Sequence, residues 1–111
     1  MATTYKRLGA AAGNGTIATA STLYTVPAAT ATVISTIVIC NTSGTAGTFS
    51  ISGSTTTSFI AGQEIVYQAA IAGNDTIGLT FGMTLDATNK YLLVSSSAAT
   101  IMFSVFGSEI A

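Results

Sequence analysis

The chain has 111 residues, of which only seven are charged, three basic and four acidic, and none is histidine. Charged residues make up 6% of the chain, against about a quarter in an average protein. Three cations cannot supply the roughly six to ten phosphate contacts of a duplex-binding protein, so we expect no nucleic-acid partner. Without histidine there is no His-based triad or His-ligated metal, and the single cysteine, Cys40, has no partner for an internal disulfide.

Strands and turns are predicted along the whole chain. Apolar runs rich in β-branched and aromatic residues end at clusters of Gly, Asn or Ser, and the chain contains 20 threonines. The Ala-rich pieces are too short and too close to glycine to start a helix. No apolar run approaches the about 20 residues that a membrane-spanning helix needs, so we expect no membrane partner.

The first elements in chain order are an N-terminal arm and two strands. Residues 1–15 are predicted as the arm, with a strand over residues 3–8 followed by a flexible linker of Gly, Ala and Asn. A short strand is expected over residues 23–26, where Pro27 ends it because proline cannot donate to a strand ladder. Residues 32–41 give the strongest strand signal in the chain.

Strict alternation within residues 32–41 places apolar side chains on both faces of that strand. It predicts one face of Val33, Ile37 and Ile39, and an opposite face of Ile34, Val38 and Cys40. Such a strand is covered on both sides, or its outer face meets a neighbouring molecule.

The rest of the chain contains five more predicted strands. After a hairpin loop at residues 43–47, residues 48–52 alternate between apolar and hydroxyl side chains, which predicts one face open to water. The remaining strands are expected over residues 64–71, 76–81, 91–95 and 99–106. Seven or eight short strands in one domain over residues 1–111 predict an all-β fold, an antiparallel β-sandwich or jelly roll.

The few chemically active side chains predict no catalytic, cofactor or metal site. Asp75 and Asp86 lie in predicted turns, where Asp is common for its hydrogen bonds to the backbone. The alternatives are a carboxylate pair for acid–base catalysis, or a Ca²⁺ site built from Asn74, Asp75 and Asp86. Cys40, with no histidine to activate it, is expected to be a buried structural thiol.

A partner-binding segment is predicted at Tyr5, Lys6, Arg7 and Leu8, where two of the three cations are adjacent. Lys6 and Arg7 either protect an exposed strand edge or anchor the arm to an acidic partner. Because so little charge is available to cover the surface, we expect a non-enzymatic module that assembles with copies of itself.

Three segments resemble small virion proteins of tailed bacteriophages. They are Thr4-Tyr5-Lys6-Arg7-Leu8-Gly9, the region from Leu23-Tyr24-Thr25-Val26-Pro27-Ala28 through residues 32–41, and Phe103-Ser104-Val105-Phe106-Gly107-Ser108-Glu109-Ile110. The resemblance implies a capsid decoration (cement) protein, a homotrimer that contacts the major capsid protein or another virion protein. It further implies assembly in the host cytoplasm and a final location in the virion.

Two other functions fit the same sequence. One is a tail, neck or fibre component of the same particle. The other is a carbohydrate-binding adhesin module that would use Tyr24, Tyr67 or Tyr91 to stack on sugars.

Overall fold

The computed structural model describes residues 3–60 and 62–110, which form eight β-strands and no helix. The strands are β1 (Thr3–Ala12), β2 (Ser21–Thr25), β3 (Ala31–Asn41), β4 (Gly47–Ser54), β5 (Glu64–Ile71), β6 (Thr76–Leu85), β7 (Tyr91–Ser96) and β8 (Ile101–Ile110). The all-β prediction is confirmed. Among the described residues, none belongs to a helix that could cross a membrane.

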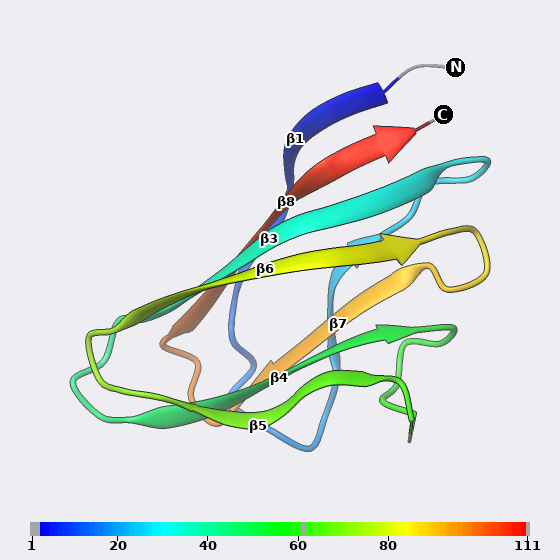
Figure 1. Ribbon diagram of the computed structural model, residues 1–111. Helices are drawn as coiled ribbons and strands as arrows, with labels where there is room; N and C mark the ends of the chain where they lie inside the picture. Colours follow the sequence, from blue (N-terminus) through cyan, green and yellow to red (C-terminus); the bar gives the residue numbers. More distant parts are fainter. Residues whose placement is uncertain (1–2, 61, 111) are drawn as a thin grey trace.

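The strands form two antiparallel four-stranded sheets that pack face to face (Figure 1). Sheet A has the order β1-β8-β3-β6, and sheet B has the order β2-β7-β4-β5. Strand β1 pairs with β8, β2 with β7, β3 with β6 and β4 with β5, so the first half of the chain pairs in reverse order with the second half. This pairing plan is that of a jelly roll, one of the two architectures predicted from the sequence.

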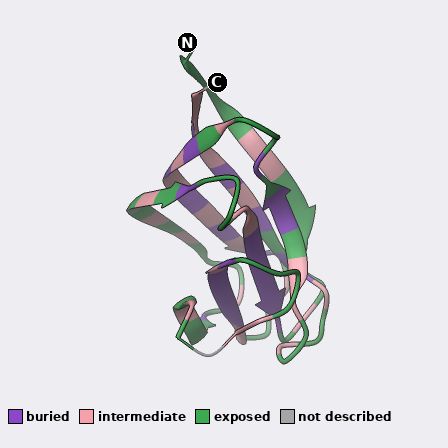
Figure 2. Cartoon of the chain, turned by 90° about the vertical axis from the view of Figure 1, so that its right-hand side faces the viewer, coloured by how far each residue is buried: buried purple, intermediate pink, exposed green. Residues whose placement is uncertain are grey.

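The core lies between the two sheets and is almost entirely aliphatic. Its largest fully buried side chains include Phe49 of β4 and Phe103 of β8, whose rings meet edge to face with centroids 6.4 Å apart. Buried residues follow the strands, whereas exposed residues gather in the turns and along the outer strands (Figure 2). On β8, Ile101, Phe103 and Val105 point into the core.

A β-bulge in β3 makes the predicted faces of that strand wrong. The pairing of β3 with both β6 and β8 shifts between Ile34 and Thr36. The additional residue reverses the alternation, so Ile34 and Ile37 both point into the core. Val33 and Val38 consequently lie on the outer face, where they are half-buried.

The outer face of β4 is not open to water as predicted. Ser50 and Ser52 are buried, because two connections fold over this side of sheet B. The β4–β5 connection is held by the Ser52 hydroxyl, which donates to the Gln63 carbonyl at 2.8 Å. The β1–β2 connection is held by the Ser95 hydroxyl, which donates to the Ile17 carbonyl at 2.8 Å.

The N-terminal segment is a strand of the sandwich over most of its length, and not an arm with a linker. β1 continues through Ala12, four residues into the predicted linker, and pairs with β8 from Thr3 to Ala12. A bulge at Leu8 lets the strand continue through the Gly/Ala segment, because small side chains do not hinder pairing at a sheet edge. Residues 1–2 of the predicted arm lie outside the described residues.

Candidate functional site

The structure separates the four predicted partner-binding residues into two pairs. Tyr5 and Arg7 are exposed and pair with Ser108 and Phe106 of β8, on the outer face of sheet A. Lys6 points to the opposite side of the strand, and Leu8 packs against the core. Only Tyr5 and Arg7 are therefore presented to a partner that approaches this sheet.

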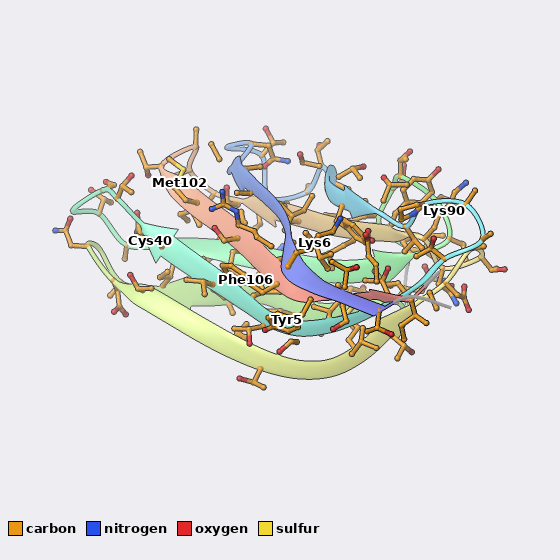
Figure 3. All side chains as sticks on the ribbon, turned by 90° about the horizontal axis from the view of Figure 1, so that it is seen from above. Tyr5, Lys6, Cys40, Lys90, Met102 and Phe106 are labelled. Atoms are coloured by element: carbon orange, nitrogen blue, oxygen red, sulfur yellow. The ribbon has the colours of Figure 1, made fainter. Side chains whose placement is uncertain are left out.

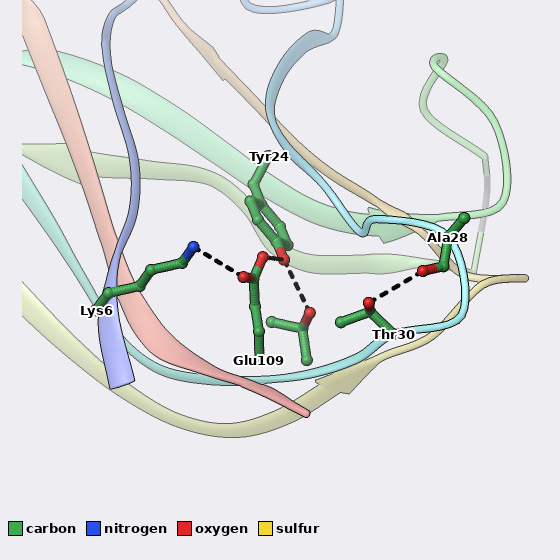
Figure 4. Close-up of polar contacts among 6 residues, drawn as sticks. Lys6, Tyr24, Ala28, Thr30 and Glu109 are labelled. Carbon is green, nitrogen blue, oxygen red and sulfur yellow. Dashed lines mark hydrogen bonds and ion pairs between the residues drawn. The ribbon is translucent and has the colours of Figure 1, made fainter. Parts of the chain in front are cut away.

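Lys6 belongs to a cluster of polar side chains near the chain termini, which we call the end cluster and which consists of Lys6, Tyr24, Thr32 and Glu109 (Figure 4). The Lys6 ammonium lies 2.9 Å from one carboxylate oxygen of Glu109. The Tyr24 hydroxyl donates to the other oxygen at 2.5 Å and lies 2.9 Å from the Thr32 hydroxyl. Because its members come from β1, β2, β3 and β8, the end cluster joins sheet A to sheet B.

Within the end cluster, the hydrogen bond between Tyr24 and Glu109 shifts the pKa values of these two residues in opposite directions. Burial, followed by the hydrogen bond to Glu109, raises the pKa of Tyr24 to about 12. The hydrogen bond from Tyr24, followed by that from Lys6, holds the pKa of Glu109 below its ordinary value. Both shifts favour a neutral tyrosine that donates to a charged carboxylate, which is a stabilising arrangement without a free acid or base.

The outer face of sheet A is a broad surface that no described element covers (Figures 1 and 3). Register places on this face Tyr5 and Arg7 of β1, Met102, Ser104 and Phe106 of β8, and Val33, Val38 and Cys40 of β3. Among the described side chains on it, Arg7 is the only charged one. Tyr5 is 65% exposed and Met102 is 36% exposed.

Cys40 lies on this same surface and is not buried as predicted. It is half-buried and pairs with Met102 of β8 (Figure 3). Cys40 alternates with the core residues Ile37 and Ile39, so it points to the outer face of sheet A, which no described element covers.

The predicted carboxylate alternatives are wrong because the groups lie far apart. Asp75 precedes β6 and Asp86 follows it, so the ten residues of that strand separate them by about 30 Å. Asp86 accepts hydrogen bonds from the Thr88 and Asn89 backbone, at 2.8 Å each. The Asn89 bond, followed by the Thr88 bond, lowers the pKa of Asp86, as expected for a turn-forming carboxylate. No group of three potential metal ligands occurs among the described residues.

Of the three tyrosines considered for sugar stacking, only Tyr67 is freely presented. Tyr24 is buried in the end cluster, and Tyr91 is half-buried with the Lys90 ammonium 5.3 Å from its ring centroid. Tyr67 is 69% exposed and lines a pocket on the outer side of sheet B. Sequence reasoning missed this pocket. The available signal was that Val66 and Ala69, three positions apart, both pack against the core, which interrupts the alternation of the strand.

Comparison with known proteins adds no assignment to these observations. The chain matches no protein-family model, and no curated protein matches its sequence.

Proposed function

We propose that the protein is a non-enzymatic structural component of a virus particle, a capsid decoration protein that acts as a homo-oligomer, with three copies expected. The outer face of sheet A carries this proposal. A monomeric domain covers about a quarter to a third of its surface with charge. Around a single arginine, this face instead carries an exposed tyrosine, an exposed methionine and the half-buried Val33, Val38 and Phe106. A surface of this composition is suited to burial against another protein.

The edge of the same sheet supports burial in an assembly. β6 is the outermost strand of sheet A and contains ten residues, none of them charged or proline. Proteins that remain monomeric usually protect such an edge with lysine, proline or a covering loop. At the other edge, β1 has Lys6 and Arg7, so the two edges of sheet A differ in their ability to accept a neighbouring strand.

The jelly roll is compatible with the proposal but does not select it. Viral capsid proteins, lectins and cupins all use this architecture, so function must be argued from surfaces and not from the fold. The resemblance of three chain segments to tailed-phage virion proteins gives the proposal its particular assembly, the outer shell of a capsid.

Oligomeric state provides the first test. We expect the wild-type chain to sediment as an oligomer at micromolar concentration, and Val38→Glu to sediment as a monomer. In register Val38 lies between Ser104 and Gly78, so the new carboxylate has no cation beside it and would be buried unpaired in an interface. Thr55→Glu, in the exposed β4–β5 connection, is the control and should leave the oligomer intact. A wild-type chain that is monomeric at these concentrations contradicts the self-assembly.

The position of the protein in a particle provides the second test. Cryo-electron microscopy of virions that contain the chain should show it in hundreds of copies over the shell, with threefold symmetry. Six or twelve copies at one vertex would instead assign it to the neck or tail. Absence from purified virions would overturn the structural role altogether.

A further inference from the structure

A pocket of about 180 Å³ lies on the outer side of sheet B, away from the outer face of sheet A. Its floor is formed by neighbouring positions of β4 and β5, among them Ser50, Glu64 and Tyr67. The β1–β2 connection contributes Ile17, and the β4–β5 connection contributes Phe59. The hydrogen bonds from Ser95 to Ile17 and from Ser52 to Gln63 hold these two walls against the sheet, so the pocket is built into the fold.

A strained β-bulge shapes the floor of the pocket. Phe49 pairs with Ala69 and Ile51 with Val66, so Tyr67 and Gln68 together oppose the single residue Ser50. Gln68 has φ of 48°, a left-handed conformation that is unfavourable for a residue with a side chain. Its amide N–H donates to the Ser50 hydroxyl at 2.8 Å. Strain of this kind is found where the backbone positions side chains for a ligand, and here it places both Tyr67 and Gln68 in the pocket wall.

The polar groups of the pocket are suited to a ligand with several hydroxyls. One carboxylate oxygen of Glu64 accepts from the Gly62 N–H at 2.8 Å, while its other oxygen has no hydrogen bond among the described residues. Ser50 is 4% exposed, and its hydroxyl accepts one hydrogen bond but donates to no described group. Together, the second carboxylate oxygen of Glu64, the Ser50 hydroxyl and the side-chain amide of Gln68 offer both hydrogen-bond acceptors and donors.

The charge of the pocket restricts the ligand further. None of the described residues that line it is cationic, and Glu64 contributes a negative charge. An anionic ligand such as a phosphate or a sugar acid would face this carboxylate without compensation. The volume is also below the about 300 Å³ at which pockets begin to take drug-sized molecules, so a single ring fills it.

We propose that this pocket binds one neutral pyranose ring, the terminal sugar of a glycan. The C–H face of the sugar packs on the Tyr67 and Phe59 rings, and its hydroxyls bond to Glu64, Gln68 and Ser50. An uncharged sugar ring matches both kinds of group in the pocket. Its apolar C–H face packs on aromatic rings, and the hydroxyls at its polar rim bond to a carboxylate. This function is separate from the proposed assembly through sheet A, and neither depends on the other.

The test is a titration of the ¹⁵N-labelled full chain with glucose, galactose, mannose, fucose and N-acetylglucosamine, followed by NMR. At least one sugar should bind with a Kd on the order of 1 mM, as expected for a single ring, and should shift the amide signals of Ser50, Tyr67 and Gln68. Tyr67→Ala should weaken that binding about tenfold or more. Tyr5→Ala is the matched control, because Tyr5 is as exposed as Tyr67 but lies on the other sheet.

Three results would overturn the proposal. The first is no saturable shift at these amides with any of the five sugars up to about 50 mM. The second is a sugar whose binding Tyr67→Ala and Tyr5→Ala weaken equally. The third is tighter binding of butylammonium than of every sugar, which would make the pocket a site for cationic side chains. A Glu64→Gln variant separates the ligand classes further, since it should weaken sugar binding severalfold but abolish binding of a cation.

Discussion

Replacing Tyr24 by phenylalanine removes the hydroxyl at the centre of the end cluster and should strongly destabilise the protein. The charged carboxylate of Glu109 loses the hydrogen bond from Tyr24, and a bond to a charged group is worth about 1.5–3 kcal/mol. The hydroxyl of the fully buried Thr32 also loses its hydrogen-bond partner. Allowing for the ion pair with Lys6 that remains, we expect the free energy of unfolding to fall by about 2–4 kcal/mol. For a chain of 111 residues that corresponds to a fall in Tm of about 9–17 °C, measurable by calorimetry.

The same substitution has a distinctive effect at alkaline pH. Tyrosine in the unfolded chain loses its proton near pH 10, whereas the pKa of Tyr24 in the folded protein is about 12. The folded state therefore binds more protons in this window, and stability present below pH 10 is lost as the pH rises toward 12. Tyr24→Phe should remove this part of the alkaline decline, whereas Tyr67→Phe, which alters an exposed hydroxyl, should retain it. A Tyr24→Phe protein as stable as the wild type, with an unchanged alkaline decline, would refute the stabilising role of the end cluster.

Three further changes test other parts of the structure. Glu109→Gln should flatten the acid side of the profile of stability against pH. The pKa of Glu109 is lowered in the folded state, so its stabilisation is present above the ordinary pKa of 4.5 and is lost as the pH falls below it. Thermal melts between pH 3 and 6 will measure this difference. Gly107→Ala should prevent folding, because its Cβ would collide with the Val33 carbonyl oxygen on the neighbouring strand, and circular dichroism would then show no β signal. Gln68→Gly should raise the free energy of unfolding by about 0.5–1 kcal/mol in urea titrations by relieving the left-handed strain, and a loss of stability there would contradict it.

The strands were predictable because each apolar run is bounded by turn residues, and the turns are local. β5 agrees with its prediction at both ends, and β7 differs from its own by one residue. The bulges were not predictable by alternation, since a single additional residue at Ser35–Thr36 reverses the faces of everything that precedes it. Whether Ser35 or a neighbour takes the bulge depends on β6 and β8, which pair with β3 from far along the chain.

Candidate sites were less predictable than strands, because they depend on which faces become covered. Lys6 and Arg7 are adjacent in sequence, yet one is used internally by Glu109, a residue 103 positions later, and the other faces outward. In the sequence, Ser50 and Ser52 have the pattern of a strand face open to water, but in the structure the two connections over sheet B bury them. The pocket at Tyr67 arises from this covering together with a bulge, and neither has a strong local signal.

The reversed pairing of the strands also limits when each strand pair can form during synthesis. Thr3 pairs with Ile110, so β1 can pair only after β8 has been synthesised, a delay on the order of 10 s at ordinary rates of synthesis. Only the central β4–β5 hairpin can close early, and the pairs outside it follow from the middle outward. During that interval strands such as β3 and β4, which contain no charged residue, are exposed before their later partners have been synthesised.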